Sequence, residues 1–190
     1  RTKARGEKAV FETIADAVVL RPSIIFGPED EFFNRFAKIA RLSPVLPLIG
    51  GGETRFQPVY VDDVAEAVAL AVDGKVAGGR IYELGGPETL TFRQCLEKLL
   101  EVTDRKRLFV PVPWWAARLQ GRVLGLLPNP LLTTDQVEML RSDNVVSEKA
   151  ASEGRTFAGV GVTPQAMDAI LPSYLWQYRP AGQFTKPNAA

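Results

Sequence analysis

The sequence predicts an α/β fold in which strands alternate with helices and the helices cover a parallel sheet. Residues 17–26 form an almost unbroken apolar run, as in strands that are buried on both faces. Residues 80–84 form a second strand-like run, and glycine-proline steps close both runs. Between the two runs, apolar residues recur at helical spacing over residues 61–72. This alternation is typical of βαβ units and of a parallel sheet.

The first half of the chain predicts three helices separated by strands and loops. The pattern indicates a helix over residues 2–14, a strand over 17–26, and a helix over 31–42 that Ser43-Pro44 ends. We expect a plain flexible loop over 47–54, with Gly50-Gly51-Gly52 at its centre, and a short strand over 55–59. Asp63 is followed by Glu66 three residues later, as in a capping box, so we expect a helix cap there.

The second half predicts shorter elements. After the strand at 80–84, Thr91 and Gln94 form a capping box, and a helix follows that has one apolar face. A strand over 107–112 and a helix over 113–127 come next, and a further helix opens near residue 133. We expect irregular structure over 152–161 and a last helix that begins at Thr163-Pro164.

The composition excludes several kinds of site. The chain has 190 residues, no His and a single Cys, Cys95, so Ser-His-Asp and Cys-His catalysis and a His/Cys zinc site are excluded. We predict no metal site. Disulfide bonding within the chain is impossible, which favours a reducing compartment. The net charge of +1 predicts no particular partner and gives no reason to expect nucleic acid.

Residues 20–28, with the sequence LRPSIIFGP, carry the first candidate site. They are similar to the R-P-x-x-x-[YF]-G-P segment of extended short-chain dehydrogenases. The resemblance implies that the end of this strand flanks the nicotinamide of a bound NAD or NADP. It makes Pro22, Ser23, Ile24 and Ile25 candidate cofactor contacts. Ligands of open parallel sheets bind at such strand ends. The alternative is a buried strand that ends in a proline-bracketed turn.

Lys3 is the second candidate. The N-terminal segment resembles the Tyr-x-x-x-Lys helix of the same family, in which spacing by four residues places both side chains on one helix face. A nearby ammonium lowers the pKa of a phenol, so the tyrosine can act as an acid or base. The matching tyrosine position would precede Arg1. The resemblance makes Lys3 a catalytic and cofactor-binding candidate; the alternative is a solvated surface lysine.

Arg55 is the third candidate. Residues 51–65 resemble the family's R-x-[FP]-[VI]-x-V-x-D-V-A block, in which the matching arginine of sugar-nucleotide enzymes contacts substrate phosphate. The alternative for Arg55 is a surface ion pair with Glu53 or another acid. We interpret Asp62 and Asp63 as helix caps and not as catalytic carboxylates. The glycines at 50–52 match neither G-x-G-x-x-G nor a P-loop, so no phosphate cradle is expected in this chain.

The resemblance implies a domain organisation. The chain would be the C-terminal part of an extended short-chain dehydrogenase (Rossmann-like) fold, with a small, mostly helical lobe on the substrate side. We expect residues 1–73 to be the last units of the dinucleotide-binding sheet domain, whose earlier strands would lie upstream. Residues 74–180 would form the smaller substrate-side lobe, and residues 181–190 a tail.

A closer resemblance covers most of the chain. Residues 25–37, 50–61, 107–113 and 132–138 together look like the short-chain-dehydrogenase-like accessory subunit of respiratory complex I, in a bacterial version. This resemblance implies bound NADPH, no established turnover and a position near the membrane. Two other classes stay open: a catalytic NAD(P)-dependent sugar-nucleotide epimerase, dehydratase or quinone reductase, and a purely structural interaction module.

The segment from Arg105 to Leu127 is basic and apolar. It carries five cations and no acid, with two tryptophans and several leucines among them. Such a segment suits an anionic membrane surface or a groove in a partner protein. The alternative is ordinary core packing with a solvated basic face. We therefore expect a cytoplasmic protein, with a peripheral position on the inner face of the membrane as the further option.

Overall fold

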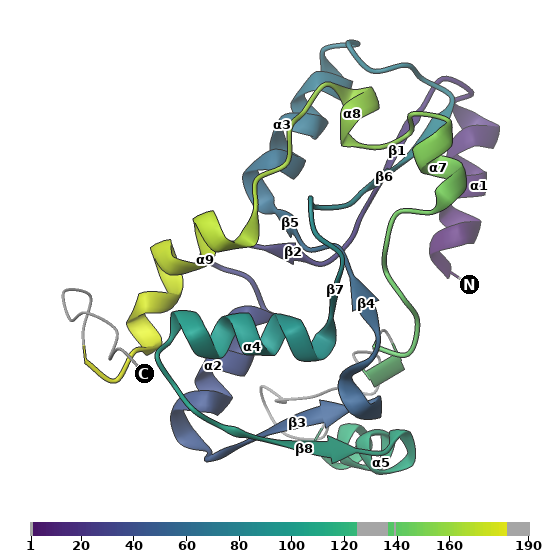
Figure 1. Cartoon of the computed structure of the whole chain (residues 1–190). Coiled ribbons are helices and arrows are strands. Elements are labelled where there is room, and N and C mark those ends of the chain that lie inside the picture. Colours follow the sequence, from purple (N-terminus) through teal and green to yellow (C-terminus); the bar gives the residue numbers. More distant parts are fainter. Residues whose placement is uncertain (1, 125–136, 139, 182–190) are drawn as a thin grey trace.

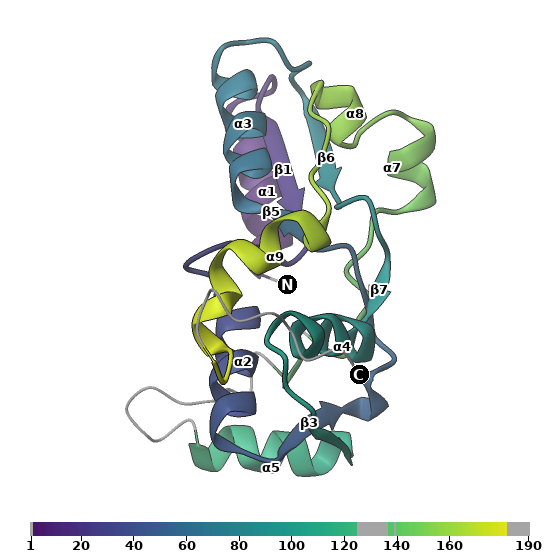
Figure 2. The same cartoon turned by 60° about the vertical axis from the view of Figure 1, so that its left-hand side comes forward.

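The computed structural model describes residues 2–124, 137–138 and 140–181 (Figure 1). Its elements form two packed groups, one above the other in Figure 2, each with its own hydrophobic cluster. The upper group holds α1 (Thr2–Thr13), β1 (Val18–Pro22), β6 (Arg80–Leu84) and α3 (Val61–Val72). The short helices α7 (Glu148–Ser152) and α8 (Phe157–Val160) lie beside β6.

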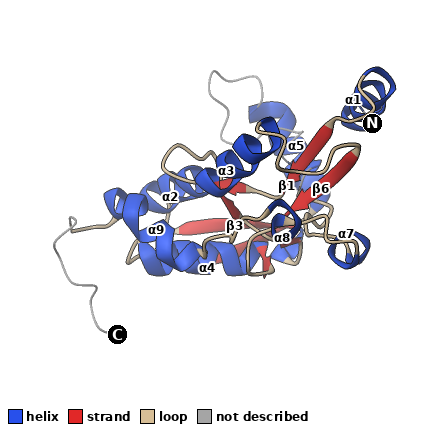
Figure 3. Ribbon diagram, turned by 90° about the horizontal axis from the view of Figure 1, so that it is seen from above, coloured by secondary structure: helices blue, strands red, loops and turns tan. Residues whose placement is uncertain are grey.

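The strands of the upper group are parallel, as the sequence predicts. β1 pairs with β6 from Val18 opposite Arg80 to Pro22 opposite Leu84, and Figure 3 shows the two running side by side. A second parallel pair joins β2 (Ile25–Phe26) to β5 (Val59–Tyr60). The cluster beneath them is made of apolar residues from the strands, α3, α8 and the neighbouring loops: Val59, Ala67, Val76, Tyr82, Leu84, Phe157, Val160 and Val162.

The lower group is mostly helical. It contains α2 (Phe33–Leu42), α4 (Phe92–Val102), α5 (Trp114–Leu124), α9 (Met167–Leu175) and the 3-10 turn η2 (Trp176–Tyr178). A parallel pair, β3 (Val45–Ile49) with β8 (Leu108–Val112), closes its lower side. The antiparallel pair of β4 (Arg55–Phe56) and β7 (Leu90–Thr91) lies where the two groups meet.

Helix α4 forms as its local sequence predicts. The Thr91 hydroxyl accepts the backbone N–H of Gln94 at 3.1 Å, and the Gln94 side chain accepts the N–H of Thr91 at 2.8 Å. This is a complete capping box. The apolar face beyond it is buried against the lower cluster, and its members are Phe92, Cys95, Leu96, Leu99 and Leu100.

Helix α2 begins two residues later than expected. The Asp30 carboxylate accepts the backbone N–H groups of Phe33 at 2.5 Å and Asn34 at 3.2 Å, so it satisfies two of the free donors of the first turn. The other Asp30 oxygen accepts the hydroxyl of Tyr174 on α9 at 2.6 Å. Asp30 therefore both starts α2 and holds α9 against it.

The apolar run over residues 17–26 is not one strand, contrary to our expectation. The chain changes partner at its middle: Ser23 N–H donates to the carbonyl of Leu84, whereas Val59 N–H donates to the carbonyl of Ile24. Consequently β1 adds to β6 and β2 adds to β5. The predicted strand over 55–59 is likewise divided into β4 and β5, because Gln57 and Pro58 lie between two different strand pairs.

The predicted loop over 47–54 was wrong in its first part. Residues 45–49 form β3, which pairs with β8 and buries Leu46, Leu48 and Ile49. The η1 turn (Gly50–Gly52) follows, and all three of its glycines have positive φ. A Cβ at Gly50 would overlap the ring of Trp114. The three glycines therefore form a tight turn in which Gly50 and Gly52 are packed against neighbouring side chains, and not a plain flexible loop.

The expected helix caps were also wrong. Helix α3 begins after Tyr60 with no side-chain cap, and the nearly fully buried Asp63 reaches across the molecule instead. Its carboxylate accepts the backbone N–H of Gln165 at 2.7 Å and the side-chain N–H of Gln165 at 3.1 Å.

The last helix begins at Met167, not at Thr163-Pro164. Residues 152–161, expected to be irregular, contain α8.

Strand pairing crosses the boundary predicted at residue 73. β6 lies after the boundary and pairs with β1, whereas β3 lies before it and pairs with β8. The division into residues 1–73 and 74–180 stays a prediction. The expected helix near residue 133 and most of the tail at 181–190 lie outside the described residues.

Candidate functional site

A cavity of about 220 Å³ lies at the carboxyl ends of β1 and β6. This is where open parallel sheets bind ligands. Its strand walls are Arg21, Ser23, Glu83 and Leu84. Residues 143–147, which lead into α7, form the opposite wall. The cavity therefore joins the predicted strand-end segment to a part of the chain more than a hundred residues away.

Ser23 is the predicted cofactor residue that lines the cavity. Its side chain donates to the Asn144 carbonyl at 2.6 Å and accepts the N–H of Gln57 at 3.1 Å. Only 7% of the residue is exposed. Both hydrogen-bonding functions of the hydroxyl are thus used within the protein. A cofactor beside Ser23 would meet a side chain that is already held in place.

The other residues of the predicted segment do not line this cavity. Pro22 is half-buried at the end of β1, and Ile24 is half-buried against the lower hydrophobic cluster. Ile25 is 40% exposed at the start of β2. Of the four predicted contacts, the structure brings Ser23 alone into the cavity wall.

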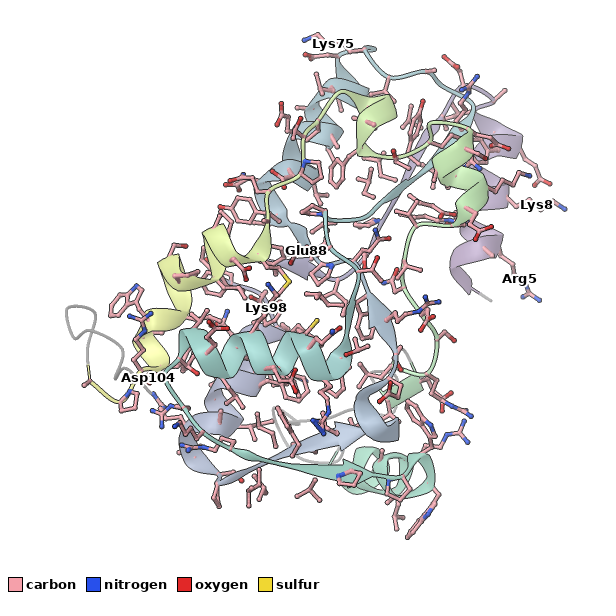
Figure 4. The ribbon with its side chains drawn as sticks, in the orientation of Figure 1. Arg5, Lys8, Lys75, Glu88, Lys98 and Asp104 are labelled. Atoms are coloured by element: carbon pink, nitrogen blue, oxygen red, sulfur yellow. The ribbon has the colours of Figure 1, made fainter. Side chains whose placement is uncertain are left out.

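Arg21 connects the strand to helix α1. Its guanidinium Nε donates to Glu7 Oε1 at 2.9 Å, a second nitrogen donates to the other Glu7 oxygen, and Nη1 lies 3.9 Å from Glu83 Oε1. The hydrogen bond from Arg21 lowers the pKa of the Glu7 carboxyl. Lys3 lies in α1 one turn before Glu7, but its side chain is outside the described part. Two other cations of α1, Arg5 and Lys8, point outward (Figure 4).

Arg55 has an internal partner. One oxygen of the Asp143 carboxylate, Oδ1, accepts the backbone N–H of Arg55 at 2.9 Å. The other oxygen, Oδ2, accepts the Nε–H of Arg55 at 2.8 Å and lies 2.8 Å from its Nη2. The pKa of Asp143 is lowered, first by the backbone N–H and then by the guanidinium. The ion-pair alternative for Arg55 is the arrangement that the structure has, with Asp143 and not Glu53 as the acid.

Several residues of the site could not be identified from the sequence. The Gln57 side chain accepts the N–H of Val146 at 2.5 Å, and Glu83 accepts the N–H of Ser147 at 2.8 Å. Asn144 pairs with Phe56 as an isolated parallel bridge. Gln57 lies inside the recognised block, so its position gave a signal. The segment at 143–147 gave none, because its partners are remote in sequence.

Other chemistry-bearing groups lie elsewhere. Burial raises the pKa of the Cys95 thiol to about 12, so the thiol stays protonated and is not a nucleophile at neutral pH. Lys98 of α4 lies 2.6 Å from Asp168 and 3.3 Å from Glu88, a cluster that joins α4 to α9 (Figure 4). Among the described residues, no group of His, Cys, Asp and Glu is placed to hold a metal ion.

A larger, open cavity of about 600 Å³ lies between α1 and the start of β6. Its charged lining residues are Arg80, Glu153 and Arg155. Arg155 donates to Glu153 and to the Ile81 carbonyl, at 2.6 Å each.

In the part of the chain that is described, no helix is long and apolar enough to cross a membrane.

Comparison with known proteins finds similar sequences. The model of the 3-beta hydroxysteroid dehydrogenase/isomerase family matches residues 2–77. NADH dehydrogenase [ubiquinone] 1 alpha subcomplex subunit 9, mitochondrial, of Arabidopsis thaliana is 33% identical over 192 residues, which cover 96% of this chain and 47% of that protein. The protein of the same name from Rattus norvegicus is 34% identical and covers 90% of this chain and 45% of its own length.

The solved structures with a similar fold include sugar-nucleotide epimerases and dehydratases. The UDP-glucuronic acid 4-epimerase of Bacillus cereus, solved with UDP-glucuronic acid and NAD, matches with a TM-score of 0.61 at 17% identity. The match covers 93% of this chain and 51% of that one. The chain thus spans about half the length of the curated relatives it matches. By sequence, the chain is similar to the NADH dehydrogenase [ubiquinone] 1 alpha subcomplex subunit 9 proteins over 90% or more of its length, and by fold it is a Rossmann-like α/β protein of the kind seen in the solved epimerases and dehydratases.

Proposed function

We propose that this chain is part of an NAD(P)-binding, non-catalytic accessory subunit of respiratory complex I, the NADH:quinone oxidoreductase. The observation that carries the proposal is similarity over 96% of the chain to a protein named as an NADH dehydrogenase subunit. The state of the site supports the non-catalytic part. Arg55, the predicted substrate-phosphate contact, is instead held by an ion pair with Asp143.

The proposed cofactor is NAD or NADP, and solved relatives of this fold hold NAD. This chain would contribute Lys3 toward the nicotinamide ribose and residues 22–25 beside the nicotinamide. The glycines at 50–52 are not available as a phosphate cradle, because Trp114 fills the space over Gly50 and Arg93 lies against Gly52. We therefore propose that this chain contributes to the nicotinamide half of the site and not to the pyrophosphate cradle.

The experiment that tests the proposal uses the full-length protein in its native membranes. After mild solubilisation, an affinity-tagged protein should migrate with the other complex I subunits on a native gel. It should release a stoichiometric dinucleotide when it is denatured. A protein that migrates alone and carries no dinucleotide would contradict the assignment.

The catalytic alternative makes a different prediction. A sugar-nucleotide epimerase, a dehydratase or a quinone reductase of the same superfamily needs a proton-transferring group beside Lys3. If the full-length protein carries a tyrosine before Arg1 and turns over NAD(P)H with a quinone or a sugar nucleotide, the catalytic reading replaces the accessory one.

A membrane-facing role for the segment from Arg105 to Leu127 is a second proposal. Trp115 is 72% exposed and Leu119 is 57% exposed, which supports an apolar contact there. Several cations of the segment form hydrogen bonds within the protein, so less of its basic charge is available to a membrane surface than the sequence predicts. Arg105 donates to the Tyr178 carbonyl, Arg107 to the Ala40 carbonyl and Arg118 to Glu138. Leu126 and Leu127 lie outside the described residues.

The proposed location follows from these two proposals. We infer a peripheral position on the inner face of an energy-transducing membrane, cytoplasmic if the source is bacterial. The named relatives are mitochondrial proteins, which supports association with the respiratory membrane. The bacterial source stays a prediction.

A further inference from the structure

Three arginines lie at one corner of the lower group, where helices end. Arg41 stands in the last turn of α2, and Arg105 and Arg107 stand between the end of α4 and the start of β8. Figure 1 shows the chain leaving α4, passing α2 and entering β8 at this corner. The strand-end cavity lies at β1 and β6 in the upper group, so the corner is a separate part of the surface.

Two of these arginines are held in place by backbone carbonyls at the ends of helices. Arg105 Nε donates to the Tyr178 carbonyl at 2.7 Å, and Arg107 Nε donates to the Ala40 carbonyl at 2.6 Å. Carbonyls in the last turn of a helix have no amide partner within the helix, and basic side chains often bind them. Because a carbonyl is neutral, each bond orients a guanidinium group without cancelling its charge.

The positive charges of the corner act on one another. Burial lowers the pKa of Arg105, and the charges of Arg107 and Arg41 lower it further. Among the described residues, no carboxylate forms an ion pair with any of the three. Asp104, at the end of α4 in Figure 4, is not among the charges that act on Arg105. Like charges held together without a counter-ion destabilise a fold, so this cluster is suited to an anion supplied from outside it.

We propose that Arg41, Arg105 and Arg107 form a binding site for a phosphate group. A guanidinium presents several N–H donors in one plane, which matches the oxygens of a phosphate. The site goes beyond the proposed accessory role and depends on neither complex I nor a dinucleotide. Its failure would therefore leave that role untouched.

The phosphate group has two chemical sources, a soluble phosphate ligand and a phospholipid headgroup. Leu42 and Leu108 follow Arg41 and Arg107 in the chain, and they are 81% and 73% exposed. A phospholipid would place its phosphate on the arginines and its apolar part on these leucines. A soluble ligand would use the arginines alone, so the two sources differ in whether the leucines contribute.

The site is tested by calorimetry with inorganic pyrophosphate on the full-length protein. Arg41→Gln removes one cation whose side chain forms no hydrogen bond or ion pair within the described residues. We expect this variant to bind pyrophosphate about tenfold more weakly than the unaltered protein, since one charge-assisted contact is lost. Pyrophosphate that binds elsewhere, as at a dinucleotide site, is unaffected by the substitution and cancels in the comparison.

The matched control is Arg5→Gln, which causes the same loss of charge. Arg5 is exposed on α1 and points outward in Figure 4, away from the corner. A loss of affinity confined to Arg41→Gln supports the site. Equal affinity in Arg41→Gln and the unaltered protein, or an equal loss in Arg5→Gln, overturns it.

The source of the phosphate is decided with vesicles of phosphatidylcholine that contain phosphatidic acid. If the source is a phospholipid, Arg41→Gln and Leu108→Gln should both reduce sedimentation with these vesicles, whereas Leu108→Gln should leave the affinity for pyrophosphate unchanged. If the source is soluble, neither substitution should alter sedimentation. Either result supports the phosphate site only together with weaker pyrophosphate binding in Arg41→Gln.

A measurement on the unaltered protein covers the case in which Arg41→Gln does not fold. Phenylglyoxal modifies accessible arginines, and mass spectrometry of peptides gives the rate at each one. Saturating pyrophosphate should slow the modification of Arg41 about fivefold or more relative to that of Arg5, because a bound phosphate covers the guanidinium. Equal rates at Arg41 with and without pyrophosphate would overturn the proposal.

Discussion

Ser23 shows how one side chain can decide the course of the backbone. It stands where the chain leaves β1 and enters β2, and its hydroxyl joins Gln57 to Asn144 at that point. The Gln57 N–H and the Asn144 carbonyl also bond to each other at 3.2 Å, and the hydroxyl gives each of them a second partner. Ser23, which the sequence predicts to contact a cofactor, therefore also holds the backbone in place between β1 and β2.

Substitution of Ser23 should destabilise the chain. In Ser23→Ala, the Asn144 carbonyl loses its strongest donor, and we expect the free energy of unfolding to fall by about 1–2 kcal/mol. Urea unfolding followed by circular dichroism measures this loss. Ser173→Ala is the control, because the Ser173 hydroxyl donates to a backbone carbonyl at an exposed position. Equal losses in the two variants would contradict the structural role.

Lys3 and Arg55 should differ in their effect on cofactor binding. In the full-length protein, Lys3→Ala removes a predicted contact to the nicotinamide ribose and should weaken dinucleotide binding by about 1.5–3 kcal/mol. Arg55→Ala should have a smaller effect, because Arg55 is already paired with Asp143. Fluorescence titration with NADH and NADPH gives the affinities. An unaltered affinity in Lys3→Ala would refute the assignment of Lys3.

At the scale of elements, the start of α2 depends on one half-buried carboxylate, that of Asp30. Burial raises the pKa of Asp30 above its ordinary value, although Tyr174 and three backbone N–H groups act in the opposite direction. A raised folded-state pKa means that the folded chain takes up a proton more readily than the unfolded chain. The contribution of Asp30 to stability should therefore increase as the pH falls from neutral through that pKa, and level off near the unfolded value of about 3.9.

Asp30→Asn isolates this contribution. The difference in unfolding free energy between the unaltered chain and the variant should shift in favour of the unaltered chain between pH 7 and pH 4. Urea titrations at several pH values measure the difference. A difference that is constant over this range, or that moves the other way, would contradict a raised pKa.

Helix α5 allows a test of the membrane proposal. The 190-residue chain should float with anionic liposomes at low salt, and less so at high salt or with neutral lipid. Trp115→Ala should reduce flotation, because Trp115 is the most exposed aromatic side chain among the described residues. Trp176→Ala, at the C-terminal end of α9, serves as the control. Flotation that is absent with both lipids, or indifferent to salt, would exclude the electrostatic version.

At the scale of the whole molecule, we propose that the described chain supplies only the nicotinamide half of a dinucleotide site. The strand ends and α1 are present, whereas Gly50 and Gly52 lie against the side chains of Trp114 and Arg93. A dinucleotide also needs backbone donors for its pyrophosphate. We therefore expect the isolated 190-residue chain to bind NADPH only weakly. Calorimetry tests this, and micromolar affinity would reveal a second cradle elsewhere in the chain.

The sequence by itself determined the features whose interactions are local. The capping box of α4 joins residues three apart, so Thr91 and Gln94 predict it without any knowledge of the fold. Short-range patterns likewise predict the apolar face of α4 and the strands β6 and β8. The α/β class, the parallel pairing and the superfamily followed from such segments and from motif resemblance.

Only the tertiary structure decided which remote residues meet. Arg55 and Asp143 are 88 residues apart, and Asp63 and Gln165 are 102 apart, so no local pattern could pair them. The division of residues 17–26 into β1 and β2 depends on two different partner strands, and β3 depends on β8. A strand is defined by its partner's backbone hydrogen bonds and an ion pair by two side chains in space. Strand pairs and ion pairs between remote residues therefore form only when folding brings the two partners together.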